Sequence, residues 1–276
     1  MLINCELPIS MLQMNDELND FDFILLHLML SDPGYRDYYM SRVGNGRVTI
    51  LDCSAYEFYV KGQDVPLGEY RDVIEKLHPT AYILPDKLMD KERTIVQSIP
   101  FAESMKYNAS LPIGVLQGNS VDDFVQCAMR YYSAHIRCVA IPFHNTFFKG
   151  IDLPSAFDAF TRLNQYYDTD TKAMMVEDIQ YAAGRYSTIQ SIRCVLKQFD
   201  YVHLLGSHCP FEKALYTDGL IKSMDTGYPV KCGIAGYTLG KEPGKPNIIL
   251  DDFLNDDLTD NQVKRIRSNI IKFKDI

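Results

Sequence analysis

The sequence predicts an α/β fold, a (β/α)8 barrel (TIM barrel), and three observations support this prediction. The chain contains eight short apolar runs, helical patterns lie between most of them, and its 276 residues suffice for one such barrel. The runs are almost continuously apolar, which is typical of parallel strands that are covered on both faces. An open, doubly wound sheet is the alternative. The eight runs are 23–28, 48–51, 81–84, 113–116, 138–141, 201–205, 221–224 and 231–235.

Helical patterns fill the intervals between the runs. Ser120 is placed to cap a helix that begins at Val121, with Asp123 at the third helical position. Apolar residues then recur at helical spacing up to Tyr132, and the same pattern covers 67–77. Strands that alternate with helices indicate βα units, and eight such units make a barrel.

One connection is much longer than the others and predicts an inserted helical subdomain. Residues 144–199 separate the fifth and sixth runs, and helices are expected at about 155–166 and 171–198. We expect the whole chain, 1–276, to be a single barrel domain that contains this insertion and ends in a basic C-terminal helix at 259–276.

The composition excludes several classes of protein. Hydrophobic residues make up 46% and charged residues 23% of the chain, a balance that excludes a disordered or fibrous protein. With 28 basic and 36 acidic residues, the net charge of −8 excludes binding to duplex nucleic acid by overall charge, so such binding would need a local basic patch. The seven cysteines are scattered without a CxxC pair, which predicts neither a structural zinc site nor a disulfide framework.

The N-terminal segment predicts a cytoplasmic protein. Residues 1–22 contain five acidic residues, no basic residue and no long apolar core, so we expect no secretory signal peptide. The longest apolar run, 23–30, is too short to span a bilayer. We therefore expect a reduced compartment and no contact with a membrane.

Polar residues at the ends of the runs indicate where chemistry gathers. In a barrel the strands end on one rim, where the βα loops carry the active site. Asp52, Asp225 and the amide of Gln117 directly follow a run, and Asp86 lies two residues after one. Each Asp taken alone is more simply a helix cap or a loop acid, whereas several on strand ends favour a site.

These residue types suit chemistry on a sugar that carries a base. Two carboxylates across a pocket can act at an anomeric carbon, where one attacks C1 and the other moves a proton. Gln117 and Asp86 would read the hydrogen-bonding edge of a base, and Tyr56 would offer its ring a flat face. The residues alone predict a barrel enzyme that uses paired aspartates on a glycoside or nucleoside.

Six segments at the strand ends carry a family resemblance. They are Asp52-Cys53-Ser54-Ala55-Tyr56-Glu57, Asp86-Lys87-Leu88, Ile113-Gly114-Val115-Leu116-Gln117-Gly118-Asn119, Ile141-Pro142-Phe143, His203-Leu204-Leu205-Gly206-Ser207-His208 and Met224-Asp225. In the same order they resemble the strand-end motifs of the tRNA-guanine transglycosylase family. The chain is most similar to the compact phage members, which place 7-deazaguanines into DNA. The family's zinc-binding pattern of three Cys and a His is absent here, so the resemblance implies no metal and no cofactor.

The resemblance implies a reaction and a role for each site residue. The chain would be a pentosyltransferase that replaces guanine in a nucleic acid, DNA being favoured, with a 7-deazaguanine derivative in the cytoplasm, that of the host if the chain is phage-encoded. Asp225 would be the nucleophile that forms a covalent aspartyl-sugar intermediate, and Asp52 the general acid and base. The implied substrate-binding residues are Tyr56, Asp86, Gln117, Gly118, Phe143, Leu205 and Gly206.

Basic residues outside the strand ends are candidates for contact with phosphates. They are Lys149 and Arg185 in the insertion and Lys264, Arg265 and Arg267 in the C-terminal helix. A packed insertion and a solvated helix face are the alternatives.

Three other functions stay open at this point. The chain could exchange queuine or preQ1 into tRNA. It could be a hydrolytic N-glycosidase or a nucleoside enzyme on the same barrel. It could also be a non-catalytic partner subunit with a degenerate site, although retention of Asp52 and Asp225 argues against this. The oligomeric state is not predicted.

Overall fold

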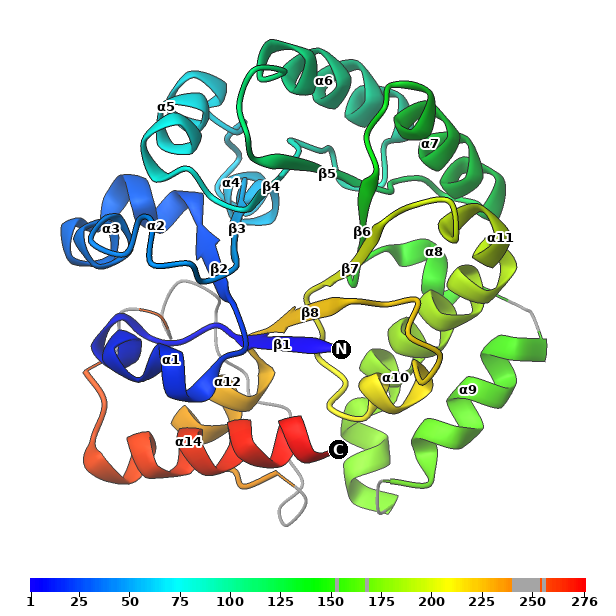
Figure 1. Ribbon diagram of the computed structural model, residues 1–276. Helices are drawn as coiled ribbons and strands as arrows, with labels where there is room; N and C mark the ends of the chain where they lie inside the picture. Colours follow the sequence, from blue (N-terminus) through cyan, green and yellow to red (C-terminus); the bar gives the residue numbers. More distant parts are fainter. Residues whose placement is uncertain (152–153, 167–168, 240–253, 255–256) are drawn as a thin grey trace. The chain divides into compact units, whose positions relative to one another are not determined.

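The computed structural model describes residues 1–151, 154–166, 169–239, 254 and 257–276. Eight strands form one parallel sheet in the order β1-β8-β7-β6-β5-β4-β3-β2, and helices alternate with the strands along the chain (Figure 1). This is an α/β fold, a (β/α)8 TIM barrel, and the predicted fold class is confirmed.

The elements are short strands and mostly short helices. The strands are β1 Leu2–Cys5, β2 Asp22–Leu25, β3 Thr49–Asp52, β4 Ala81–Ile83, β5 Leu111–Val115, β6 Cys138–Pro142, β7 Tyr201–Leu205 and β8 Ser223–Thr226. The helices are α1 Asn15–Leu18, α2 Leu26–Ser31, α3 Pro33–Met40, α4 Ala55–Val60, α5 Leu67–Leu77, α6 Lys91–Ser104, α7 Val121–Ser133, α8 Thr146–Lys149, α9 Pro154–Asn164, α10 Thr169–Ser191, α11 Arg193–Leu196, α12 Tyr228–Ile234 and α14 Asp260–Asp275. Two 3₁₀ helices are η1 Ile9–Met14 and η2 Glu212–Leu215.

The structure corrects the prediction of the last strand. Residues 231–234 of the predicted strand 231–235 lie in α12, whose first turn contains Pro229. The eighth strand is β1 instead, which pairs in parallel with β8. The sequence did not predict β1 because this segment is only 4 residues long and contains a polar residue, Asn4, that is nevertheless buried.

Among the other runs, two differ most from the predicted bounds. The run 23–28 divides between β2, which ends at Leu25, and α2, which begins at Leu26. Both parts are buried, and a short apolar run does not distinguish a strand from a buried helix. The run 221–224 is displaced to Ser223–Thr226, so Asp225 lies inside β8 rather than after it.

The described chain divides into two compact units. The first unit comprises 1–20, 143–193 and 204–276, and the second comprises 21–142 and 194–203. In the second unit, α7 begins after Ser120, whose side chain accepts a hydrogen bond of 3.0 Å from the Asp123 N–H, as predicted.

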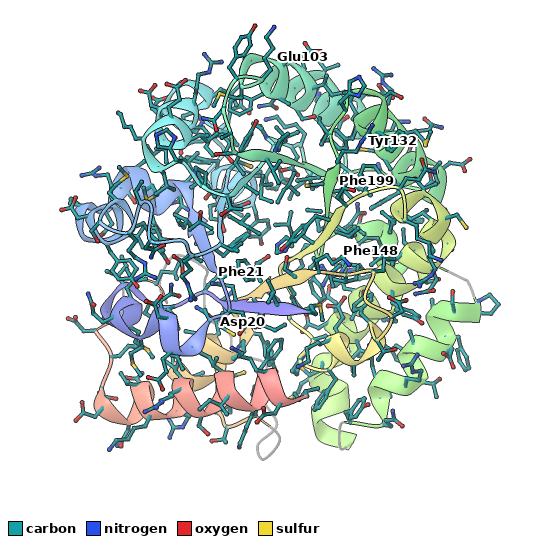
Figure 2. All side chains as sticks on the ribbon, in the orientation of Figure 1. Asp20, Phe21, Glu103, Tyr132, Phe148 and Phe199 are labelled. Atoms are coloured by element: carbon teal, nitrogen blue, oxygen red, sulfur yellow. The ribbon has the colours of Figure 1, made fainter. Side chains whose placement is uncertain are left out.

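Aromatic side chains fill the interior of the second unit. Tyr70 is fully buried on α5, and its hydroxyl lies 2.7 Å from the carbonyl oxygen of Ile83 and 3.1 Å from that of Leu51. The rings of Tyr132 and Phe199 meet edge to face with centroids 5.9 Å apart (Figure 2). The polar tip of Tyr70 thus ties α5 to two strands while its ring packs in the core.

The first unit contains α8, α9 and α10 of the predicted insertion, whereas α11 lies in the second unit except for its first residue, Arg193. The predicted helix 155–166 corresponds to α9, and the predicted helix 171–198 is divided into α10 and α11; residues 152–153 and 167–168 lie outside the described residues. The predicted basic helix is α14, which begins with a capping box between Thr259 and Gln262 and packs on α12. Among the described residues, no helix is long and apolar enough to cross a membrane.

Candidate active site

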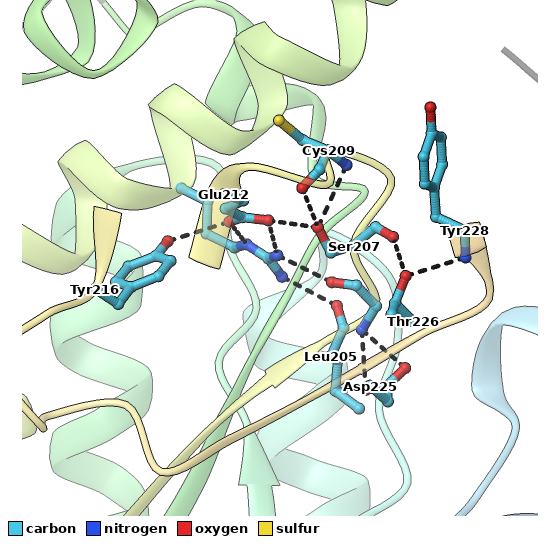
Figure 3. A network of polar contacts seen from close by, with 10 residues as sticks. Leu205, Ser207, Cys209, Glu212, Tyr216, Asp225, Thr226 and Tyr228 are labelled. Carbon is cyan, nitrogen blue, oxygen red and sulfur yellow. Dashed lines mark hydrogen bonds and ion pairs between the residues drawn. The ribbon is translucent and has the colours of Figure 1, made fainter. Parts of the chain in front are cut away.

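The Asp225 carboxylate is the centre of a polar cluster in the first unit. Asp225 is the third residue of β8, lies opposite Asn4 of β1 in the strand register, and is 3% exposed. The Gly206 N–H donates to both carboxylate oxygens, at N···O distances of 3.0 and 3.1 Å (Figure 3). The Gly206 backbone amide therefore binds both oxygens of a buried carboxylate.

Gly206 is placed for this contact by the end of β7. It directly follows Leu205 and has φ of 63°, in the left-handed region that favours glycine. This turn directs its N–H towards β8. The resemblance implied that Gly206 and Leu205 contact substrate; the structure gives the Gly206 backbone the role of a donor to Asp225.

A buried ion pair lies next to this turn. Arg185 of α10 and Glu212 of η2 are both fully buried, and the Arg185 Nε and Nη2 groups donate to the two Glu212 oxygens at 2.8 and 2.5 Å. The hydroxyls of Tyr216 and Ser207 also donate to Glu212, at 3.1 and 2.8 Å (Figure 3). These four donors compensate the carboxylate for its loss of water.

Arg185 carries its charge inside the protein. Burial on its own lowers the pKa of Arg185, but the charge and hydrogen bonds of Glu212 outweigh it and raise that pKa, with a smaller contribution from the charge of Asp225. The prediction that Arg185 contacts phosphate is therefore corrected, because its side chain is buried and paired with Glu212. Sequence reasoning missed Glu212 and Ser207, whose relation to Arg185 depends on how α10 packs.

Hydrogen bonds also join the end of β8 to the segments that follow β7 and β8. The Thr226 hydroxyl donates to the carbonyl oxygen of Ser207 at 2.6 Å and accepts from the Tyr228 N–H at 3.1 Å (Figure 3). Thr226 and Ser207 are the neighbours of Asp225 and Gly206 in the sequence. The segment that carries the Asp225 carboxylate is thus also joined to the segment that carries its donor, Gly206, by the hydrogen bond between Thr226 and Ser207.

An aromatic group surrounds Phe143 in the same unit. Phe143 is 2% exposed, and the Arg185 guanidinium carbon lies 4.8 Å from the centroid of its ring. The ring centroids of Tyr181, His208 and His144 lie 5.6, 5.5 and 5.1 Å from that of Phe143. The Phe143 side chain is therefore a packing element of this cluster, and its implied contact with substrate stays a prediction.

The second unit brings together Asp86 and Gln117, as the prediction requires. The Gln117 side-chain amide donates to Asp86 Oδ2 at 2.7 Å, and its carbonyl oxygen accepts from the Met89 N–H at 2.8 Å. Asp86 is 7% exposed and Gln117 2%. Burial raises the pKa of Asp86 to about 6, and the hydrogen bond from Gln117 only partly offsets it. Asp86 can therefore change its charge near neutral pH.

Cys53 is a neighbour of Asp86 that sequence reasoning missed. Burial, followed by the charges of Asp52 and Asp86, raises the pKa of the Cys53 thiol. The protonated thiol lies 3.9 Å from Asp86 Oδ1, within the range of a hydrogen bond from sulfur. The residue directly follows Asp52, and this position was the only signal in the sequence.

Asp52 is the last residue of β3 and is half-buried. Its Oδ2 accepts a hydrogen bond of 2.8 Å from the Ser54 N–H. Ser54 has φ of 55°, and its hydroxyl accepts from the His27 N–H at 3.2 Å. Tyr56 follows on α4 and is 41% exposed, so its ring is accessible for stacking.

Gly118 has a structural role in the second unit. A Cβ atom at this position would lie 2.3 Å from the Cβ of Asp123. Glycine is therefore required where α7 approaches the end of β5, and its implied role in substrate binding stays a prediction.

The four other candidates for phosphate contact differ in their surroundings. Lys149 pairs with Glu177 at 3.0 Å, and Arg267 pairs with Glu17. Lys264 is exposed and Arg265 half-buried, and neither forms an ion pair with another described residue.

Within the described part of the chain, no group of three or more His, Cys, Asp and Glu side chains could hold a metal ion. No protein-family model matches the chain, and no curated protein matches its sequence. The proposed function rests on the fold, on the geometry of these residues and on the resemblance of the strand-end segments.

Proposed function

We propose that the protein is a base-exchange pentosyltransferase that replaces guanine in a nucleic acid with a 7-deazaguanine base. One observation carries this proposal. The buried Asp225 carboxylate lies on a strand of a (β/α)8 barrel, and the Gly206 N–H orients it. A carboxylate held in this way suits nucleophilic attack at an anomeric carbon.

The proposed reaction has two displacement steps at C1′ of one nucleotide. In the first step a carboxylate oxygen of Asp225 bonds to C1′ while the bond from C1′ to guanine N9 breaks. The guanine takes a proton from Asp52 as it leaves. In the second step the incoming base gives its proton to Asp52 and bonds to C1′, and the ester bond to Asp225 breaks. The backbone of the nucleic acid is unchanged, and no oxidant or metal enters the balance.

The Asp86–Gln117 pair supports the choice of guanine-like bases. The edge of guanine presents neighbouring N–H donors, and an ionised carboxylate can accept from two of them. Gln117 already orients the Asp86 carboxylate, so little entropy is lost when a base binds. DNA is favoured over tRNA because the chain lacks the family's zinc-binding pattern and is most similar to the compact phage members, which act on DNA.

A comparison of substrates tests the proposal. DNA and tRNA are incubated separately with the protein and a 7-deazaguanine base, and their nucleosides are then measured by mass spectrometry. We expect the 7-deazaguanine nucleoside to replace deoxyguanosine in DNA. Replacement in tRNA instead would identify the tRNA alternative. Abasic sites without incorporation would identify a hydrolase, and no change in either polymer would overturn the proposal.

The variant Asp225→Asn tests the nucleophile. We expect it to lose exchange and to form no denaturation-resistant adduct with nucleic acid, because a carboxamide cannot act as an anionic nucleophile. Asp218→Asn is the matched control, since Asp218 is in the same unit and its ion pair is with Arg193. A folded Asp225→Asn protein that exchanges base at the wild-type rate would exclude Asp225 as the nucleophile.

A further inference from the structure

Arg185 has an unusual role for a buried arginine, because it binds both an acid and the backbone. Two of its hydrogen bonds go to Glu212. Two more go to backbone carbonyl oxygens, from Nη1 to Leu205 at 3.1 Å and from Nη2 to Gly206 at 2.9 Å. The planar guanidinium thus holds a fixed relation between η2 and the end of β7.

One of these carbonyls belongs to the peptide group that faces Asp225. The Leu205 oxygen and the Gly206 N–H are the two ends of a single trans peptide, and they point in opposite directions. Arg185 binds the oxygen end, and the Asp225 carboxylate accepts from the N–H end. A donor that fixes the oxygen therefore fixes the direction of the N–H. It also polarises the peptide and strengthens the hydrogen bond to Asp225.

We propose that Arg185 and Glu212 are positioning residues, which hold the Leu205–Gly206 peptide so that its N–H orients the Asp225 carboxylate for attack on C1′. The part of this inference that concerns the reaction rests on the proposed function. The part that concerns the positioning of the peptide rests on the hydrogen bonds alone. Glu212 neutralises the guanidinium and fixes its plane, and it is itself fixed by Ser207 and Tyr216.

The positioning can be tested without any substrate. If the carbonyl carbon of leucine and the nitrogen of glycine are isotopically labelled, NMR can select the amides of glycines that directly follow a leucine. The full chain has three of them, Gly68, Gly206 and Gly240. The NMR signal that moves in Asp225→Asn identifies Gly206. We expect Arg185→Lys to move the same signal upfield, because a lysine beside Glu212 keeps the charge but cannot also reach both carbonyls.

The consequence for exchange is measured on the same variants. In Arg185→Lys we expect kcat to fall by about 100-fold, the cost of a misplaced reacting group. The KM for the free base should stay within twofold, because Arg185 is not assigned to its binding. The double variant Arg185→Met/Glu212→Leu replaces the buried pair with apolar side chains of similar size and is expected to fold. It should show the same loss of kcat.

Arg193→Lys is the matched control. Arg193 forms an ion pair with Asp218 in the same unit and makes no hydrogen bond to Leu205 or Gly206. An unmoved Gly206 signal in Arg185→Lys would overturn the inference, as would a moved signal with unchanged kcat, or an equal loss of kcat in Arg193→Lys. If the wild-type protein exchanges no base, the proposed function fails, while the Gly206 signal still decides whether Arg185 holds the peptide.

Discussion

The Asp86 carboxylate is buried, yet it must be ionised to accept the N–H donors of a guanine edge. Its ordinary pKa of 3.8 is raised to about 6, chiefly by burial. The folded protein therefore binds this proton more tightly than the unfolded chain does. Between about pH 4 and pH 6 the unfolded state loses the proton first, so for this group the free energy of unfolding falls as the pH rises.

Asp86→Asn is expected to stabilise the protein at pH 8 and not at pH 4. A shift from 3.8 to about 6 corresponds to about 3 kcal/mol at pH values above both. The asparagine oxygen can still accept from Gln117, so the hydrogen bond survives without the charge. Chemical denaturation at pH 4, 6 and 8 measures this effect. Asp72→Asn, at an exposed position of α5, is the control, and equal pH profiles of wild type and Asp86→Asn would contradict the expectation.

Binding of the free base should depend on the same proton. Protonated Asp86 has lost acceptor capacity, so the affinity for guanine is expected to fall by about tenfold for each pH unit below about 6. Calorimetric titration with guanine at pH 7 and pH 5 measures this. An affinity that is constant over this range would show that Asp86 does not accept from the base.

At the scale of elements, α8 and α10 pack so closely that one position between them must lack a side chain. A Cβ atom at Gly184 of α10 would lie 1.9 Å from the backbone oxygen of Phe148 on α8. Phe148 is 2% exposed and Gly184 is buried, so neither partner can move into solvent. The same helix carries Arg185, and the packing at Gly184 therefore sets the depth at which the guanidinium lies.

Gly184→Ala is expected to lower the free energy of unfolding by about 2–3 kcal/mol, because the added methyl group overlaps backbone atoms. Gly68→Ala is the control, and its expected effect on the free energy of unfolding has the opposite sign. A Cβ there meets no atom within 4 Å, and alanine in helix α5 should raise the free energy of unfolding by about 0.5 kcal/mol. Urea denaturation compares the two variants. A Gly184→Ala protein as stable as wild type would show that α8 and α10 are not in contact as described.

At the scale of the whole molecule, a net charge of −8 opposes the approach of a polyanion. Many basic side chains are also engaged within the protein. Arg185 is buried with Glu212, Arg267 pairs with Glu17, and Lys274 of α14 with Asp20. On α14, Lys264 and Arg265 are the two nominated bases without an ion pair to a described residue. Binding of nucleic acid should therefore depend on few positions.

Lys264→Gln/Arg265→Gln is expected to weaken binding of DNA by about 10- to 100-fold at moderate salt and to lower the slope of log K against log salt by about two, one for each phosphate contact. The affinity for the free base should not change. Lys76→Gln/Lys106→Gln removes the same charge from exposed positions of the second unit and is the control. Equal salt dependence in both double variants would exclude α14 as the contact, and the polymer substrate itself would be in doubt.

Local rules account for the parts of the fold and site that the sequence alone determined. Helix α5 spans the predicted 67–77, and β7 spans the predicted 201–205. Asp86 and Gln117 were expected to act together because each follows a strand of the same sheet, and they share a hydrogen bond. Apolar periodicity, helix caps and strand ends depend on neighbours a few residues away, so they can be recognised in the sequence alone.

Tertiary structure decided what depends on distant partners. The strand Leu2–Cys5 exists because it pairs with Ser223–Thr226, more than 200 residues along the chain. Arg185 was expected on the surface and is instead the buried partner of Glu212. A charged side chain enters a protein interior only when folding supplies an opposite charge and acceptors for its hydrogen bonds. That partner comes from packing rather than from sequence spacing, which is why only the folded chain reveals how Asp225 is held.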